Sequence, residues 1–174
     1  YVLPEVPEQL RGYGRKALKA FKVKSRFIHF EFFRLTEARK GLGEVGDFVG
    51  LEVNMRPAGG FTPDMINFSH STDAYQIWAD MVCTGTSTGS KNGPDRWCVF
   101  ASRKDKFTHV HTHEEILQRY DGKLVMCQRM PDIFADAMGN QMYLALLDTE
   151  DEVREYVKYI LDEQAEIVIP SLYK

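Results

Sequence analysis

The sequence predicts a mixed α+β fold, and three observations support this prediction. Residues 26–33 and 48–55 are short runs of aromatic and branched side chains in period-two alternation, which is typical of strands. Residues 7–21 place apolar side chains along one side of a helix. Thr149 is followed by three acids, 150–152, and this pattern favours a helix start, because threonine caps the helix and acids suit its positive end.

The elements of the first half follow one another closely. They are predicted to be a helix, a strand, a polar excursion, a second strand, a glycine-rich turn and a helix, at residues 7–21, 26–33, 36–46, 48–55, 58–63 and 71–83. The first strand has His29, Glu31 and Phe33 on one face, so a carboxylate stands within an aromatic run. We expect Ser71 or Thr72 to cap the last of these helices.

A low-complexity stretch, 84–94, is the best candidate boundary in the chain. We therefore predict a domain at 1–83, a linker or loop at 84–94, and an α+β C-terminal extension at 95–174. The extension is predicted to contain a strand, an extended piece, a helix, two strands and a final helix, at 96–102, 107–111, 112–120, 123–128, 142–147 and 149–162.

Composition excludes several classes of protein. The 174 residues carry 22 Lys and Arg against 25 Asp and Glu, and 44% of them are hydrophobic. Disorder is therefore not expected, and a net charge of −3 offers no general attraction to nucleic acid or membranes. No apolar run approaches the roughly 18–20 residues that span a bilayer, and the first residues do not resemble a signal peptide. We expect a cytoplasmic protein with neither nucleic acid nor a membrane as partner, and the aromatic content of 12% leaves room for a homodimer contact.

The three cysteines are few and widely spaced. Cys83, Cys98 and Cys127 leave one thiol over in any disulfide scheme and lack the close spacing of a zinc site. We predict reduced thiols in or near the core.

Polar side chains on the two strands of the first half suggest a cation site. If these strands are antiparallel neighbours, Glu31, Glu52 and Asn54 can converge on one face, since opposed Cβ atoms lie about 5 Å apart. Two carboxylates held that close repel each other unless a cation lies between them, and hard oxygen ligands suit Mg²⁺ or Mn²⁺. The three residues are therefore candidate metal ligands.

The residues that follow suggest an anion near this cation. Arg56 is predicted to share the face of Glu52, with a planar fork of donors that fits phosphate or carboxylate oxygens. Gly59 and Gly60 would let backbone N–H groups approach an anion closely. Each residue alone has an ordinary explanation as a solvated acid, a salt-bridge partner or a turn. Their joint order favours a site.

That order resembles a known family. Phe30-Glu31-Phe32, followed by the run LEVNMRPAGGFTPD at 51–64, is similar to the metal-binding segment of the ATP-grasp superfamily, the fold of biotin carboxylase and of the carbamoyl-phosphate synthetase large subunit. The resemblance is specific over 26–83. Over 95–174 it is looser and is similar to the C-terminal extension of carbamoyl-phosphate-synthetase-like proteins. It implies the C-terminal lobe of an ATP-grasp fold, an antiparallel sheet with flanking helices, plus a small α+β extension.

The resemblance also implies roles for individual residues. The match to Glu31 binds one Mg²⁺, the match to Glu52 bridges two, and the match to Asn54 completes the second site. The match to Arg56 contacts phosphate or the reacting acyl group and is the candidate catalytic residue. Together with the two glycines, these residues form the candidate site for Mg-ATP.

The implied function is that of an ATP-dependent ligase. Such an enzyme phosphorylates a carboxylate with ATP, and an amine or a similar nucleophile then attacks the acyl phosphate. In this family the adenine pocket, the phosphate-binding lysines and the lid lie upstream of the matched segment. We therefore expect a C-terminal portion that needs a missing N-terminal ATP-grasp portion and is inactive alone. The alternative is a non-catalytic binding or assembly module that retains the fold.

Two further motifs stay outside this assignment. His109, His111 and His113 would share one face of an extended chain and could bind Zn²⁺. Thr112 with Glu115, however, has the form of a capping box, which starts a helix and breaks that alternation, so packing is favoured over metal binding. The charge run 103–106 is predicted to be a hairpin tip, with ligand contact as the less favoured alternative.

Overall fold

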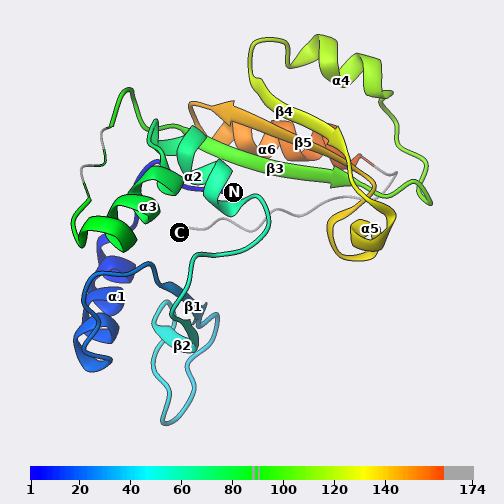
Figure 1. The fold of residues 1–174 in the computed structure, drawn as a ribbon. Coiled ribbons are helices and arrows are strands. Elements are labelled where there is room, and N and C mark those ends of the chain that lie inside the picture. Colours follow the sequence, from blue (N-terminus) through cyan, green and yellow to red (C-terminus); the bar gives the residue numbers. More distant parts are fainter. Residues whose placement is uncertain (88, 90, 163–174) are drawn as a thin grey trace. The chain divides into compact units, whose positions relative to one another are not determined.

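The computed structural model describes residues 1–87, 89 and 91–162. Within them the chain forms six α-helices and five β-strands, in two antiparallel sheets (Figure 1). The chain divides into two compact units. Unit 1 holds residues 1–4, 68–71 and those from 93 on, and unit 2 holds residues 5–67 and 72–92.

Unit 2 is built on a two-stranded sheet and three helices (Figure 1). Its elements are β1 His29–Arg34, β2 Phe48–Asn54, α1 Glu8–Ala20, α2 Thr62–His70 and α3 Ala74–Thr84, of which the last turn of α2 counts with unit 1. The side chain of Asp73 caps α3 by accepting from the backbone N–H of Gln76. The predicted cap at Ser71 or Thr72 is therefore wrong by one or two residues.

Helix α2 shortens the glycine-rich turn predicted at 58–63 and adds an element that the sequence did not predict between that turn and the helix at 71–83. Thr62, Pro63 and Asp64 form its first turn. Proline is tolerated there because its missing N–H would have no partner within the helix, and an acid there faces the positive end of the helix. The sequence thus contained a start signal, and the two preceding glycines concealed it.

Unit 1 is a three-stranded antiparallel sheet with the strand order β3-β5-β4 (Figure 1). Its elements are β3 Trp97–Arg103, α4 His113–Arg119, β4 Leu124–Arg129, α5 Asp132–Met138, β5 Gln141–Leu147 and α6 Glu150–Leu161. Val2 pairs with Cys98 and so extends the free edge of β3. Helix α6 packs against β3 and β5. Helix α5 has no counterpart among the predicted elements.

The core of unit 1 lies between its sheet and α6. Alternate residues of β3 and β5 meet apolar positions of α6, namely Val153, Tyr156 and Ile160, all of which are buried. The hydroxyl of the fully buried Tyr156 donates to the backbone oxygen of Tyr143 at 3.1 Å, so the phenol leaves no unsatisfied donor. This packing gives unit 1 a hydrophobic core of its own.

The cysteines differ from one another in burial. Cys98 is fully buried, and burial raises the pKa of its thiol to about 11. Cys127 is partly buried, and burial raises its pKa as well. Cys83 is exposed near the end of α3, so the prediction of a near-core thiol is wrong there, because the apolar face of a short helix does not reach its position.

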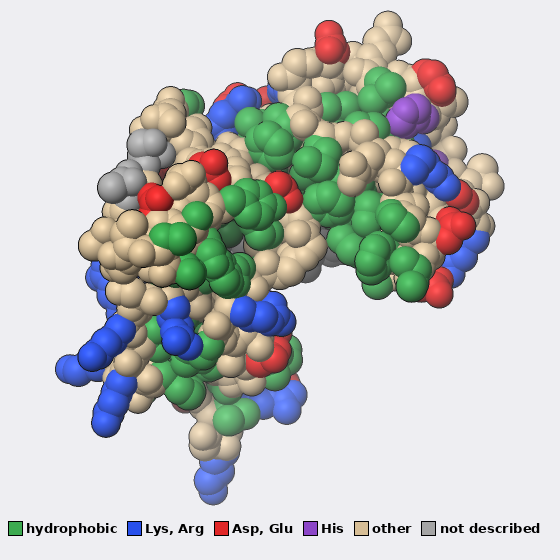
Figure 2. Space-filling view, viewed as in Figure 1, with side chains coloured by type: hydrophobic (Ala, Val, Ile, Leu, Met, Phe, Trp, Pro, Cys, Tyr) green, Lys and Arg blue, Asp and Glu red, His purple; other side chains and the backbone are tan. Residues whose placement is uncertain are grey.

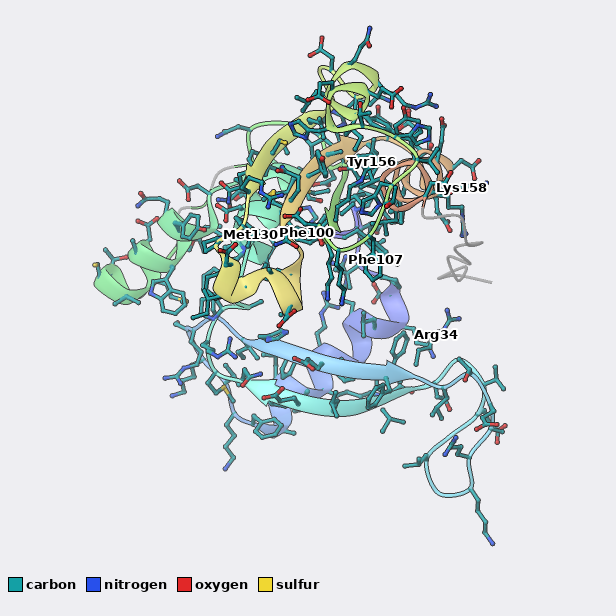
Figure 3. All side chains as sticks on the ribbon, turned by 90° about the vertical axis from the view of Figure 1, so that its right-hand side faces the viewer. Arg34, Phe100, Phe107, Met130, Tyr156 and Lys158 are labelled. Carbon is teal, nitrogen blue, oxygen red and sulfur yellow. The ribbon has the colours of Figure 1, made fainter. Side chains whose placement is uncertain are left out.

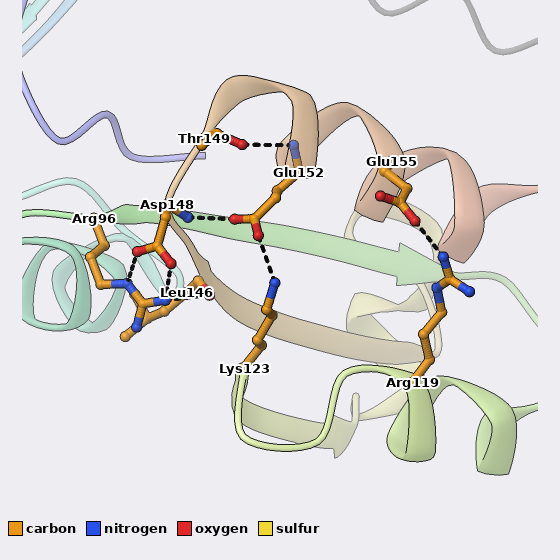
Figure 4. Close-up of polar contacts among 8 residues, drawn as sticks. All are labelled: Arg96, Arg119, Lys123, Leu146, Asp148, Thr149, Glu152 and Glu155. Carbon is orange, nitrogen blue, oxygen red and sulfur yellow. Dashed lines mark hydrogen bonds and ion pairs between the residues drawn. The ribbon is translucent and has the colours of Figure 1, made fainter.

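Ion pairs fasten α6 to the rest of unit 1 (Figure 4). Arg96, just before β3, holds Asp148 through two hydrogen bonds of 2.6 and 3.1 Å. Lys123 donates to Glu152 at 2.7 Å, and this hydrogen bond lowers the pKa of that carboxyl. Thr149 caps the helix as predicted, since its hydroxyl accepts from the backbone N–H of Glu152 at 3.2 Å.

Unit 2 has much less core. Of the buried hydrophobic residues in the described chain, only Met65 and Ala74 lie in unit 2. Many of its large apolar side chains are exposed: Val6, Leu18, Phe21, Phe33, Leu42, Val45, Leu51, Met55, Tyr75, Trp78 and Val82. Figure 2 shows hydrophobic side chains on the visible surface of this unit, beside the lysines and arginines around α1.

No helix of the described residues is both long enough and apolar enough to cross a lipid bilayer.

Two isoleucines on helices of unit 1 test this account of the core. Ile160 is 0% exposed and Ile133, on α5, is 85% exposed. We expect Ile160→Ala to lower the free energy of unfolding by roughly 2–5 kcal/mol, since it empties a packed site. Ile133→Ala should change it by less than about 0.5 kcal/mol. Chemical denaturation of both variants measures the difference, and equal losses would contradict the placement of the core.

Candidate functional site

The candidate site lies on the β1–β2 pair. The two strands are antiparallel, and Glu31 stands directly opposite Glu52. His29 stands opposite Asn54, so the polar positions of both strands fall in register. The predicted pairing of these strands is thereby confirmed. Figure 3 shows β1 and β2 side by side, with Arg34 near one end of the pair.

A β-bulge ends this register just after the Glu31–Glu52 pair. The pairing shifts between Glu31 and Phe32, and Phe32 pairs with Gly50, so Leu51 is the extra residue. On the other side of the shift, the aromatic ring of Phe32 lies 4.0 Å from the Cβ that a side chain at Gly50 would have. A side chain at position 50 would therefore meet the ring only in ordinary van der Waals contact.

Both carboxylates, Glu31 and Glu52, are accessible to solvent. The side chain of Glu31 is 39% exposed, and its Oε1 lies 3.6 Å from Nε2 of His29. Glu52 is exposed. Two buried nitrogen atoms at this level, Nδ1 of His29 and Nδ2 of Asn54, have no hydrogen-bond partner among the described residues. Buried polar atoms without partners are uncommon and call for a ligand or water.

Arg56 follows the end of β2, and the two glycines lie in the predicted turn after it. Strand β2 ends at Asn54, and Nη1 of Arg56 donates to the backbone oxygen of Pro57 at 2.9 Å. The exposed arginine thus turns toward the chain that follows it. Gly59 and Gly60 lie just before α2, and Gly60 has a φ of 60°, a left-handed conformation that glycine adopts without strain.

The donor set fits a divalent cation in its chemistry. Glu31, Glu52 and Asn54 offer hard oxygen ligands, and the unpartnered amide nitrogen of Asn54, a donor, leaves room for an acceptor beside them. No group of three acidic, histidine or cysteine side chains in the described part of the chain is close enough to hold a metal ion. Mg²⁺ in nucleotide sites commonly takes one or two carboxylates and completes its shell with phosphates and water.

The opposite side of this sheet borders an apolar cavity within unit 2. Its volume is about 630 Å³. Aromatic side chains from β1 and α3, including Phe30, Phe32 and Trp78, line it together with apolar residues of α1 and α2. Trp78 also stacks on Phe27, with ring centroids 5.5 Å apart. A polar face and an apolar hollow therefore flank the same pair of strands.

His29 is the residue of this site that sequence reasoning left without a role. The alternation of the strand placed it on the face of Glu31, which was the available signal. Its position opposite Asn54 depends on the register and could not be read from one strand alone.

The run of histidines does not form a metal site. Thr112 and Glu115 make the predicted capping box, which starts α4 at His113. The ring of His111 stacks on Tyr159 at a centroid distance of 3.6 Å, whereas His113 bonds the hydroxyl of Tyr143 at 2.9 Å. The helix start therefore separates side chains that an extended chain would have aligned.

Comparison with known proteins supplies a fold and no sequence family. No protein-family model matches the chain, and no curated protein sequence matches it. The chain is similar to the crystal structure of phosphoribosylglycinamide synthetase from Anaerococcus prevotii, with a TM-score of 0.59 and 11% sequence identity. The match covers 90% of this chain and 40% of the other, so this chain spans about two fifths of that protein's length. The likeness confirms the α+β fold class and supports an ATP-grasp fold.

The facing glutamates predict a stability effect. Like charges directly opposite each other destabilise a strand pair, so Glu52→Gln should stabilise the metal-free β1–β2 pair by roughly 0.2–1 kcal/mol. Added Mg²⁺ should cancel this gain, because only the pair of carboxylates binds the ion well. Hydrogen exchange of the β1 and β2 amides, with EDTA or with Mg²⁺, measures both effects. Glu44→Gln, which removes an exposed charge from the loop between the strands, is the control. Equal protection in both variants would contradict the facing arrangement.

Proposed function

We propose that this chain is the cation-binding portion of an ATP-grasp ligase, which joins a carboxylic acid to an amine or a similar nucleophile through an acyl phosphate. One observation supports this most directly: the register that sets Glu31 opposite Glu52, with Asn54 two residues further along β2. Two facing carboxylates on a partly exposed sheet face repel each other and do not stabilise the sheet. A cation bound between them turns this repulsion into attraction, so the arrangement suits a cation site.

The roles of the residues follow from their chemistry. Mg²⁺ or Mn²⁺, when bound, spreads the charge of the ATP phosphates and holds them in line for transfer to the carboxylate. Glu31 and Glu52 would hold the ions between the strands, and Asn54 would add an oxygen ligand without adding charge. Each carboxylate thereby loses the repulsion of the other.

Arg56 would stabilise the negative charge that develops during phosphoryl transfer. Among the described residues its side chain donates one hydrogen bond, to the backbone oxygen of Pro57, and it is exposed, so its guanidinium can turn toward an anion at small cost. Backbone N–H groups around Gly59 and Gly60, next to the start of α2, would offer further donors to the same anion.

The sparse packing of unit 2 supports the proposal that a further segment of protein covers its apolar side chains. Only two hydrophobic residues in the described part of the unit are buried, and the cavity of about 630 Å³ is bordered by apolar side chains. A protein interior is normally close-packed, so a unit of this size with so little core needs further chain to cover it. We propose that the N-terminal portion of the ATP-grasp domain covers it, and that the chain alone releases no ADP from ATP.

The position of this chain within the superfamily is a separate proposal. The sequence motif favours relatives of biotin carboxylase and the carbamoyl-phosphate synthetase large subunit. The similar solved structure is a phosphoribosylglycinamide synthetase, and its name is consistent with ligase chemistry in general.

The test uses the full-length product of the gene that encodes this chain, beside its Glu52→Gln variant. We expect isothermal titration of Mg-ATP to show binding at least about tenfold weaker in the variant, because one bridging ligand is lost. ADP release in the presence of a mixture of carboxylic acids and amines should fall at least about 100-fold.

Glu44→Gln is again the matched control, and it should leave both quantities unchanged. If Glu52→Gln binds Mg-ATP and releases ADP as the unmodified protein does, the ligase proposal fails. The alternative, a binding or assembly module that retains the fold, would then be favoured.

A further inference from the structure

Unit 1 contains a polar cavity that neither the ATP-grasp resemblance nor the cation site uses. It has a volume of about 490 Å³ and lies at the end of the sheet where β3 and β4 finish and β5 begins. The charge run 103–106 and the histidine run both contribute to it, through Lys104, His109 and His113. From the strands, Arg129, Gln141 and Tyr143 complete its lining. Two neighbouring motifs of the sequence therefore line one cavity together with strands that lie further along the chain.

The acid in this cavity is already neutralised. Asp105 accepts two hydrogen bonds from Arg129, at 2.8 and 2.5 Å, in the bidentate geometry that a guanidinium and a carboxylate prefer. These hydrogen bonds lower the pKa of Asp105, so the pair stays ionised on both sides and contributes no net charge at neutral pH. Among the residues that line the cavity, no other carboxylate is present.

Lys104 supplies a positive charge to the cavity. Its Nζ donates to the backbone oxygen of Asp136 at 2.6 Å, and it forms no ion pair within the described residues. An ammonium group has three donors, so two are available to a ligand. The anchor on α5 also holds the side chain in place, which reduces the entropy that binding would cost.

Buried and hydrogen-bonded neighbours make the walls rigid. Arg103 is 7% exposed and donates to the backbone oxygens of Ile160 and His111, at 2.6 and 2.5 Å. His113 is fixed by the hydroxyl of Tyr143. At the rim, Phe107 is 46% exposed and offers an apolar surface (Figure 3 labels it). The cavity is thus a preformed site that has two cationic side chains, Lys104 and Arg103, besides the Asp105–Arg129 pair, and one apolar wall.

We propose that this cavity binds a small organic molecule through an oxyanion, a carboxylate or a phosphate, held by Lys104. Its volume falls in the range of small-ligand sites and exceeds what a bare ion needs, so the remainder of the ligand would lie against Phe107. A metal cation does not suit the cavity, because its carboxylate is held by Arg129. The cavity lies wholly in unit 1, so its ligand is independent of the cation site in unit 2.

The test titrates the isotope-labelled 174-residue chain with phosphate and, separately, with succinate, at constant ionic strength, and follows the backbone amide signals. We expect saturable shifts at 103–107, Arg129 and Gln141 with at least one of the two anions, and the tighter one identifies the acid group. Lys104→Met should weaken that binding about tenfold, the loss typical of a charged hydrogen bond. Lys104→Arg, which keeps the charge, should retain most of it.

Lys158→Met is the matched control, because it removes the same charge from an exposed position on α6 of the same unit and does not line the cavity. Its affinity should stay within about twofold of the unmodified chain, since a remote exposed charge is screened by salt. If both methionine variants weakened anion binding equally, the binding would be explained by general electrostatic attraction, and the proposal would be overturned. The absence of saturable shifts with both anions would overturn it as well.

Discussion

The antiparallel register of β1 with β2 is the constraint on which the candidate cation site depends. Side chains alternate between the faces of a strand, so a slip of one residue would move Glu52 to the face of the apolar cavity. The loop between the strands holds the register in place, because the backbone N–H of Leu35 donates to Asp47 and that of Gly46 donates back to Leu35, both at 2.8 Å. The bulge at Leu51 then confines the aligned polar positions to one end of the pair.

The two units solve the problem of stability in different ways. Unit 1 buries a continuous core under α6 and fastens that helix with ion pairs from β3, α4 and the start of β4. Unit 2 leaves most of its apolar residues exposed and surrounds a hollow. Structure with few buried contacts opens more readily, and ligand-binding segments are often drawn from such regions. Nucleotide and cation would therefore order unit 2 more than unit 1.

Local signals in the sequence predicted most of the fold. The caps at Thr112 and Thr149 marked the starts of α4 and α6 correctly. Capping is predictable because the threonine hydroxyl accepts a hydrogen bond from a backbone N–H only three residues further along the chain. Helix α2 was hidden by Gly59 and Gly60, and α5 is too short for a periodic pattern to distinguish it from a turn. The facing of Glu31 and Glu52 followed from alternation once the strands were assumed to pair.

Features that depend on distant residues could not be predicted in this way. The course of Arg56 depends on β2 ending at Asn54 rather than continuing, and the bulge, which leaves Leu51 unpaired, depends on how the two strands pair. The cavity of unit 1 joins the loop after β3 to the end of β4 and the start of β5, at Arg129 and Gln141, which follow Arg103 by 26 and 38 residues. Residues that are distant along the chain can be predicted to lie close together only when the order of the strands in the sheet is known.

Paramagnetic relaxation by Mn²⁺ tests the central claim most directly, because it locates a bound cation without requiring catalysis. In the labelled 174-residue chain, low concentrations of Mn²⁺ should broaden the amide signals around Glu31, Glu52 and Asn54 before any others. The double variant Glu31→Gln, Glu52→Gln should abolish that selectivity. Broadening that begins elsewhere, for example at the acidic first turn of α6, or that persists unchanged in the double variant, would contradict a cation site between the two strands.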